Sequence, residues 1–299
     1  MRPVHSPVFF VDTGEFSPPA PHASLDRVNP PQVIATDLDR TLLRSDGTTS
    51  ARTRAALDMA MERGAQVIAV TARPIRWLDR LKPCFGRLPH VIASNGAVCY
   101  DLATGVAYDP RPFEPATVAK LLAGVRAALP EARFALETPH GMVREADYEL
   151  SPFDMDGDDA GRRVVPYEDL PAAVADAPLL KVLAADRTRN SADMYVEALP
   201  AVGALGQLTY STNRGVLELG PPGVDKASTL AAWCAARGIG AADVVTFGDM
   251  PNDIPMLRWA GRSWAVANAV DAAKAAATGI AAANDEDGVA QVVEELFHI

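Results

Sequence analysis

The sequence has few cysteines and no long apolar run. Its cysteines, Cys84, Cys99 and Cys234, are odd in number and show no Cys-x-x-Cys spacing, so neither a disulfide framework nor a zinc site is expected. They suit small buried residues in a reducing compartment. No run approaches the roughly 18 apolar residues of a membrane helix, and the stretch at 8–11 is too short for a signal-peptide core. We therefore expect a cytoplasmic protein with no membrane partner.

Basic residues are also scarce relative to acidic ones, 28 against 38, which gives a formal net charge of −10. Nucleic-acid binders need basic surface to meet phosphate backbones, so we expect no nucleic-acid partner. An anionic metabolite can still bind where local cations or a metal ion outweigh the overall charge. The 299 residues suffice for one large domain or two modest ones. Nothing in the pattern indicates an oligomeric state.

Residues 1–31 differ from the rest because they contain seven prolines. Each proline removes a backbone donor and fixes φ, which predicts a flexible tail. The tail holds Asp12-Thr13-Gly14, which resembles an aspartic protease motif. Such proteases need two carboxylates that share a proton, and the chain has no second copy. Only a dimer could complete that site, and we disfavour this interpretation.

Beyond the tail, short apolar runs alternate with helical segments. Strands are expected at 33–36, 67–70, 91–93, 244–247 and 264–266, with helices at 51–63, 74–81, 225–237, 254–260, 272–277 and 289–296. This alternation predicts a parallel sheet of right-handed crossover units. The middle mixes strands (98–100, 134–137, 179–184, 216–219) with helices (116–128, 191–199). We predict an α/β core at 32–96 and 222–299, with a second α/β domain inserted at 97–221.

Polar residues follow several of these strands or begin helices. Ligands of open parallel sheets bind outside the carboxyl ends of the strands. Four segments place polar groups there: Asp37-Leu38-Asp39-Arg40-Thr41, Thr71-Ala72-Arg73, Val224-Asp225-Lys226 and Gly248-Asp249-Met250-Pro251-Asn252-Asp253. Their recurrence at one sheet edge favours a single polar site.

Each segment alone has a plain structural interpretation as well. Asp37 and Asp39 could hold a divalent cation with Asp249, or simply open a solvated loop. Lys226 could neutralise a phosphate at a helix start or be an ordinary surface lysine. Thr71 could bind a phosphate oxygen or cap a helix. Capping is also the alternative for Asn252 and Asp253. The segments taken together favour the functional interpretation.

As a set, the segments resemble the motifs of the haloacid dehalogenase-like superfamily, in its Cof-like phosphatase branch. Order and spacing both fit, and the motifs span roughly 33–268. The match consists of Asp37-Leu38-Asp39-x-Thr41-Leu42-Leu43, Thr71-Ala72-Arg73, Ser94-Asn95-Gly96-Ala97, Gly223-Val224-Asp225-Lys226 and Gly248-Asp249-Met250-Pro251-Asn252-Asp253-Ile254-Pro255-Met256-Leu257. The resemblance implies a Rossmann-like parallel-sheet core, an inserted α/β cap and phosphatase activity on a small phosphorylated metabolite.

The resemblance also implies a covalent mechanism with Mg²⁺ as cofactor. Asp37 would attack phosphorus, while Asp39 would protonate the leaving alcohol and then activate water. The metal would be held by the Asp37 carboxylate, the Asp39 backbone carbonyl and Asp249. The phosphoryl group would be cradled by Thr71, Lys226, Asn252 and the backbone amides of Leu38 and Ala72. Asp253 and Thr41 would support these groups from behind.

Two positions depart from the family pattern, which usually has glycine at both: position 40 is Arg and position 72 is Ala. Glycine tolerates positive φ and close approach of a ligand better than either residue. Arg40 either adds a cation near the nucleophile or points to solvent. Ala72 is expected to tighten the phosphate pocket slightly.

The inserted block is expected to close over the site and select the substrate. Its candidate anion or sugar contacts are Arg144, Lys181 and Arg214, although solvated cations are the commoner outcome. The acidic run at 154–159 does not fit a calcium loop, because Gly157 is misplaced and no Glu ends the run. Two other functions stay open: a sugar phosphomutase-type phosphotransferase, and a phosphate-ligand sensor without catalysis.

Overall fold

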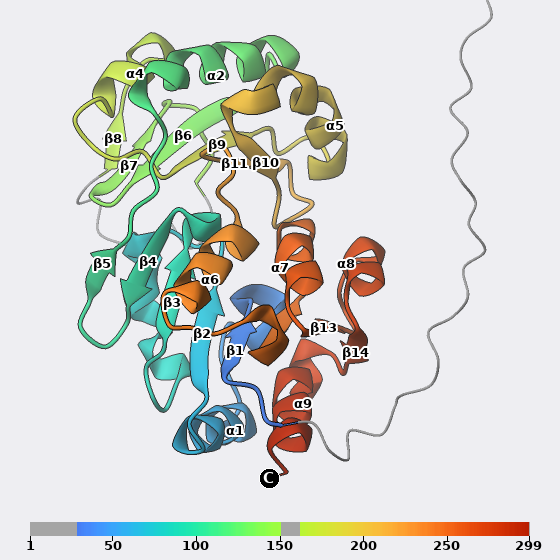
Figure 1. Ribbon diagram of the computed structural model, residues 1–299. Helices are drawn as coiled ribbons and strands as arrows, with labels where there is room; N and C mark the ends of the chain where they lie inside the picture. The colour runs from blue at the N-terminus through green and yellow to red at the C-terminus, as the bar shows by residue number, and fades with distance from the viewer. Residues whose placement is uncertain (1–28, 151–161, 299) are drawn as a thin grey trace, which may run out of the picture.

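The computed structural model describes residues 29–150 and 162–298 (Figure 1). Most of the predicted tail, the Asp12-Thr13-Gly14 motif and the acidic run at 154–159 lie outside the described residues. Within the described residues, no helix is both long enough and apolar enough to cross a membrane. All three cysteines are free and buried, as expected from their number and spacing.

The described part of the chain forms two sheets, and the larger has eight strands in the order β14-β13-β12-β1-β2-β3-β4-β5. The six strands from β14 to β3 are parallel, and β4 and β5 run antiparallel to their neighbours. Their bounds are β1 Val33–Thr36, β2 Gln66–Val70, β3 His90–Ala93, β4 Val98–Asp101, β5 Val106–Tyr108, β12 Val244–Gly248, β13 Arg262–Val266 and β14 Gly279–Ala281. The predicted parallel α/β sheet is confirmed.

Helices cover both faces of this sheet because the strand residues alternate between two apolar clusters. Ile34 packs in one cluster with α1 (Ala51–Glu62) and α9 (Gly288–Phe297). Val33 and Ala35 point to the other, with α6 (Lys226–Ala235) and α7 (Ile254–Trp259). A further helix, α8, spans Asp271–Ala276. The sheet is therefore buried on both faces, and its strand ends remain for chemistry.

The second sheet lies above the carboxyl ends of the first (Figure 1) and has six strands in the order β10-β11-β9-β6-β7-β8. Helices α2 (Pro115–Ala128), α4 (Leu170–Ala173) and α5 (Ser191–Val202) cover its outer face. We refer to this sheet and its helices as the cap. Its strands are β6 Arg133–Thr138, β7 Gly141–Arg144, β8 Arg162–Val164, β9 Lys181–Ala185, β10 Gln207–Thr209 and β11 Val216–Gly220.

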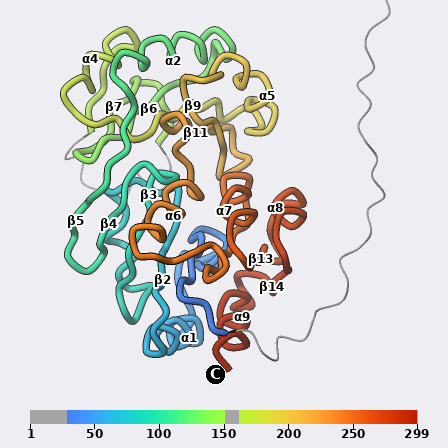
Figure 2. The backbone as a smooth tube through the Cα atoms, viewed as in Figure 1, coloured from blue at the N-terminus to red at the C-terminus, as the bar shows by residue number. Residues whose placement is uncertain are grey.

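The backbone trace shows the chain crossing between the two sheets, once before α2 and again before α6 (Figure 2). The strand predicted at 98–100, which we placed inside the inserted block, is β4 and pairs instead with the larger sheet, as does β5, for which no strand was predicted. The reason is the tight turn at Ser94–Gly96, which reverses the chain so that β4 returns beside β3. The segment predicted as a helix at 74–81 is a 3₁₀-helix over Ile75–Cys84.

Candidate active site

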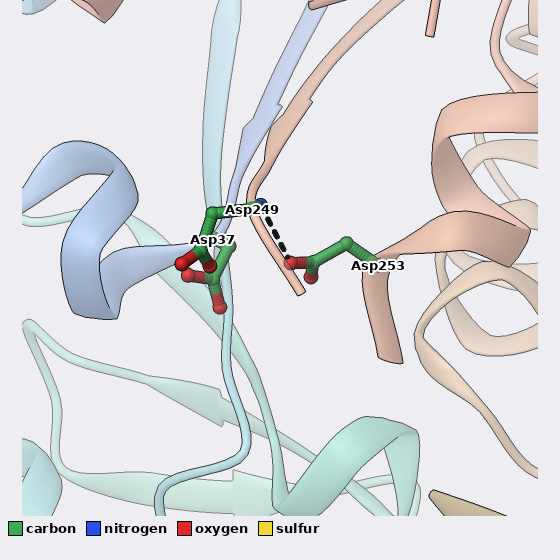
Figure 3. A group of neighbouring side chains, drawn as sticks. All are labelled: Asp37, Asp249 and Asp253. Atoms are coloured by element: carbon green, nitrogen blue, oxygen red, sulfur yellow. Dashed lines mark hydrogen bonds between the residues drawn. The ribbon is translucent and has the colours of Figure 1, made fainter. Parts of the chain in front are cut away.

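Three buried carboxylates meet at the carboxyl ends of β1 and β12. Thr36 and Phe247 are register partners in the parallel pair, which brings the following residues Asp37 and Asp249 to one edge. One carboxylate oxygen from each of Asp37, Asp249 and Asp253 lies within 4.8 Å of the others. Figure 3 shows Asp37 and Asp249 side by side, with Asp253 reaching in from the segment that precedes α7.

Lys226 brings a positive charge to these carboxylates. It is the first residue of α6 and is fully buried. The preceding residue, Asp225, caps the helix by accepting the Ser228 N–H at 2.7 Å. This cap fixes the start of α6 and therefore the position of Lys226. Its Nζ donates to Asp37 Oδ1 and to Asp253 Oδ1, each at 2.6 Å. We call Asp37, Lys226, Asp249 and Asp253 the sheet-edge cluster.

The three carboxylates of this cluster differ in how many of their oxygens already accept hydrogen bonds. Asp253 Oδ2 accepts the backbone N–H groups of Asp249 and Met250, both at 3.0 Å, while Oδ1 is held by Lys226. One of these bonds is the dashed line in Figure 3. Asp249 Oδ2, by contrast, is buried and has no hydrogen-bond partner among the residues that the structure describes. Asp253 therefore orients its neighbours, and Asp249 has an oxygen free for a ligand.

The sheet-edge cluster is buried and holds three carboxylates but only one ammonium group. Burial raises the pKa of Asp37 to about 7 despite the nearby Lys226 ammonium. Burial, with the charges of Asp37 and Asp253, raises the pKa of Asp249 to about 8. Burial alone would lower the pKa of Lys226, but Asp253 and Asp37 raise it above its usual range. A hard divalent cation with oxygen ligands would relieve this imbalance, so the donor set fits Mg²⁺.

Asp39 does not join the cluster with its side chain. Its carboxylate accepts a bidentate pair of bonds from Arg73, with Nε at 2.8 Å and Nη2 at 2.6 Å. The Arg73 side chain is 8% exposed and the Asp39 side chain 50%. Arg73 belongs to the motif Thr71-Ala72-Arg73, but the sequence did not predict a role for its side chain. A basic residue at a strand end, facing a carboxylate from the neighbouring strand end, was the signal for this pair.

The remaining predicted residues lie at the same edge, with differing partners. Thr71 is buried and its hydroxyl accepts the Arg73 N–H at 3.1 Å, which is the local bond that the capping interpretation expects. Thr41 donates to Asp249 Oδ1 at 3.4 Å. Asn252 donates its side-chain N–H to Asn95 at 3.1 Å, and its own side-chain oxygen is buried without a hydrogen-bond partner from residues 29–150 or 162–298. Leu38 and Ala72 follow β1 and β2.

Of the two departures from glycine, Arg40 has a visible consequence, whereas the contact made by Ala72 uses a backbone carbonyl that glycine would also offer. Arg40 has φ 62°, in the left-handed region that favours glycine, and Asn268 steadies it by donating to its backbone carbonyl at 2.8 Å. The Arg40 guanidinium reaches within 3.9 Å of Asp249 Oδ2 and therefore places a cation beside the cluster. The Ala72 carbonyl accepts from Lys181 of the cap at 2.6 Å.

The cap brings its own buried charges over this edge. Lys181 on β9 pairs with Glu218 on β11 at 3.1 Å, and Glu218 also accepts from Ser211 and, at 2.6 Å, from Asn95 of the core. We call Lys181, Glu218, Ser211 and Asn95 the cap-side cluster. A second contact joins Arg76 before β3 to Glu137 on β6 at 2.6 Å.

The other two basic candidates of the cap have different surroundings. Arg144 donates to backbone carbonyls at 145, 146 and 148 in its own loop, and Arg214 is exposed. Of the three candidates, Lys181 is the one whose side chain contacts the core.

A cavity of about 340 Å³ lies between cap and core beside the sheet-edge cluster and is bordered by Asn95, Lys226 and Asn252. Its walls combine aromatic and aliphatic side chains, among them Tyr195, Leu208, Tyr210, Val224, Ile254 and Pro255. The rings of Tyr195 and Tyr210 meet edge to face at 5.8 Å. The cavity is large enough for a small organic group next to the charged residues.

Comparison with known proteins places this architecture among described enzymes. The chain is 26% identical to 5-amino-6-(5-phospho-D-ribitylamino)uracil phosphatase YwtE of Bacillus subtilis, over 88% of this chain and 97% of that protein. It is 34% identical to YbjI of Escherichia coli, named for the same phosphatase activity, over 146 residues, 44% of this chain and 54% of that protein. The chain thus spans about half the length of YbjI.

A crystal structure and a family profile agree with these matches. TM0651 from Thermotoga maritima superposes with a TM-score of 0.70 at 25% identity, over 88% of this chain and 97% of that one. The family profile described as haloacid dehalogenase-like hydrolase matches residues 34–293, which covers both sheets and every segment of the site. The chain therefore belongs to the haloacid dehalogenase-like hydrolase family.

Proposed function

We propose that the protein is a Mg²⁺-dependent phosphatase that hydrolyses a small phosphorylated metabolite through an aspartyl-phosphate on Asp37. The observation that carries this proposal is the sheet-edge cluster, in which Lys226 orients Asp37 while Asp249 keeps a buried oxygen without a hydrogen bond from the described residues. Family membership and relatives named as phosphatases support the reaction type.

In the first step, Asp37 forms a bond to phosphorus as the bond to the leaving oxygen breaks. Lys226 occupies Asp37 Oδ1 at 2.6 Å, so we assign Oδ2 as the attacking oxygen. Asp39, in its acid form, gives a proton to the departing alkoxide. In the structure both Asp39 oxygens accept from Arg73, so for this step Asp39 must exchange one Arg73 bond for a proton.

In the second step, water attacks the phosphorus of the aspartyl-phosphate. Asp39 now takes the proton from water, and the bond between Asp37 and phosphorus breaks to release inorganic phosphate. Lys226 neutralises charge on Asp37 in both steps, and Asp253 holds Lys226 for that task at 2.6 Å.

Asp37, Asp249 and the Asp39 backbone carbonyl would hold the Mg²⁺ ion. When bound, the ion supplies positive charge that screens the nucleophile from the anionic substrate and stabilises the transferring phosphoryl group. The remaining sides of the phosphoryl site would be lined by Thr71, Asn252 and the backbone amides of Leu38 and Ala72. Thr41 steadies Asp249 from behind at 3.4 Å.

The cavity between cap and core supports a substrate whose leaving group is a small organic body, such as a sugar or a ring-bearing polyol. Both curated relatives reported above are named for a phosphorylated ribitylaminouracil, so this compound belongs first on a substrate panel. Sugar phosphates, nucleotides and pyridoxal phosphate complete it.

The test is phosphate release from that panel, with and without Mg²⁺, by the wild type, Asp37→Asn and the control Asp79→Asn. Asp79 is an exposed carboxylate that pairs with Lys82. We expect Mg²⁺-dependent release that Asp37→Asn lowers by at least about 10³-fold, because the nucleophile is lost, and that the control retains. Sugar phosphate interconversion without release would instead indicate a mutase, and binding without turnover a sensor.

A further inference from the structure

Asn95, the core member of the cap-side cluster, lies in a strained and tightly held turn. Its φ is 56° and that of Ser94 is 50°, conformations that are costly outside glycine. The next residue, Gly96, has no room for a side chain, since a Cβ there would lie 2.3 Å from the Asp225 carbonyl oxygen. Thr229 on α6 donates to the Gly96 carbonyl at 2.8 Å. The turn is thus clamped against α6, and the Asn95 side chain has a fixed position.

The donor and acceptor chemistry of this position sets the direction of every bond. Glu218 can only accept as a carboxylate, so Asn95 presents its Nδ2 there at 2.6 Å. The other end of the Asn95 amide is then Oδ1, which can only accept, and Asn252 donates its Nδ2 to it at 3.1 Å. Asn252 Oδ1 is left buried, and no described residue forms a hydrogen bond with it. The Glu218 carboxylate of the cap therefore determines which end of the Asn95 amide, and in turn of the Asn252 amide, faces each neighbour.

The charge state of Glu218 supports this direction. Burial would raise its pKa, but the Lys181 ammonium and hydrogen bonds from Ser211 and Asn95 keep the pKa below its usual value. Glu218 is 4% exposed and Lys181 is also 4% exposed. The carboxylate is therefore held ionised, and an ionised carboxylate has no proton to donate to Asn95.

We propose that Glu218 is a positioning residue: through Asn95 it holds the Asn252 amide so that its carbonyl oxygen is the acceptor offered to the site. An acceptor suits a water molecule or a cation better than a phosphoryl oxygen, which refines the cradling role expected for Asn252. Because Glu218 lies on the cap and Asn252 on the core, the docking of β11 against the core also sets the orientation of the Asn252 amide. The effect on catalysis rests on the proposed function.

Reversal of the bond direction tests the proposal in the full-length protein. Asn95→Asp keeps the acceptor for Asn252 but sets a second carboxylate against Glu218, so kcat/KM should fall about 10- to 100-fold. Glu218→Gln removes the charge but keeps an acceptor, and should lower kcat/KM severalfold. In the double variant N95D/E218Q, only one of the two facing carboxylates remains beside Lys181, so the repulsion that Asn95→Asp introduces is removed. The double variant should recover to within about threefold of Glu218→Gln.

Two further variants separate orientation from general packing. Glu137→Gln weakens a different charged contact between cap and core, the one with Arg76, without touching Asn95, and should keep wild-type kcat/KM. Asn95→Ser breaks both amide bonds without a new charge and should also lower kcat/KM about 10- to 100-fold, so it replaces Asn95→Asp in the test should that variant not fold. Wild-type activity in Asn95→Ser, a double variant no better than Asn95→Asp, or an equal loss in Glu137→Gln would overturn the proposal.

A second readout separates this proposal from the proposed function. Thermal stabilisation of each variant by inorganic phosphate with Mg²⁺ is measured beside turnover of p-nitrophenyl phosphate and the panel. If the wild type turns over nothing, the phosphatase proposal fails. If stabilisation is then lost in Asn95→Asp and regained in the double variant, the role of Glu218 holds, and if it is equal in all variants, that role fails as well.

Discussion

The two buried charge clusters face each other and differ in one respect. In the cap-side cluster, Glu218 is matched by Lys181 and by donors from Asn95 and Ser211. In the sheet-edge cluster, Lys226 serves Asp37 and Asp253, and Asp249 Oδ2 has no hydrogen bond. A balanced cluster holds parts of a protein together, whereas an unbalanced one is kept because something else binds there.

The largest expected effect comes from removing each cluster's lysine. Lys226→Met leaves buried carboxylates without their cation, and should lower the free energy of unfolding by about 3–5 kcal/mol. Lys181→Met leaves Glu218 with two neutral donors, and should cost only about 1–3 kcal/mol. Denaturant unfolding of metal-free protein at neutral pH checks both values. Equal losses would remove the distinction between the clusters.

The next effect is the dependence of stability on pH. Asp37 and Asp249 have folded pKa values of about 7 and about 8, above their unfolded value of 3.8. Groups with raised pKa values stabilise the fold fully below the unfolded pKa, and this stabilisation is lost as pH rises through the folded pKa values. The Tm of metal-free protein should therefore fall between pH 5 and about pH 9. A Tm that rises over this window would contradict the charge imbalance.

Asp249→Asn sharpens that prediction because it removes the carboxylate with the unpaired oxygen. At pH 8 without metal, the variant should be more stable than wild type by about 1–3 kcal/mol, since a buried like charge is gone. Mg²⁺ should raise the Tm of the wild type but not of the variant, and more at high pH than at pH 6, because protons compete with the metal. Calorimetric scans with and without Mg²⁺ measure both.

The smallest effect on stability concerns Arg40. Arg40→Gly relieves positive-φ strain but gives the unfolded chain more freedom, so stability should change by less than about 0.5 kcal/mol. Mg²⁺ affinity should rise severalfold, because a guanidinium 3.9 Å from Asp249 Oδ2 is removed. Arg40→Lys keeps a cation and serves as the control for titration calorimetry. Unchanged affinity in Arg40→Gly would show that Arg40 does not compete with the metal.

Much of the sheet and the placement of its strand-end residues could be predicted from the sequence. Parallel strands align their carboxyl ends, so Asp37, Thr71 and Asp249 had to share an edge once the strands were identified. The motif order also predicted the position of Lys226 at the start of α6. Local pattern was enough for these residues, because each follows or begins its own element.

The cap-side cluster could not be predicted in this way. It joins Asn95, Lys181, Ser211 and Glu218, and their meeting depends on strand register and on how the cap docks. Likewise, the choice of Arg73 as partner for Asp39 depends on side-chain reach between loops. The place of β4 and β5 was wrong because the turn at Ser94–Gly96 reads as a connection to the insertion, while its geometry makes a hairpin.

The strand order also has a consequence for synthesis of the chain. β1 lies in the middle of the larger sheet between β2 and β12, and β12 begins at Val244. At about 5–20 residues per second, a ribosome delivers β12 roughly 10–40 s after β1. For that interval one edge of β1, the strand that leads into Asp37, has no native partner, and the nascent chain must be kept from pairing with others.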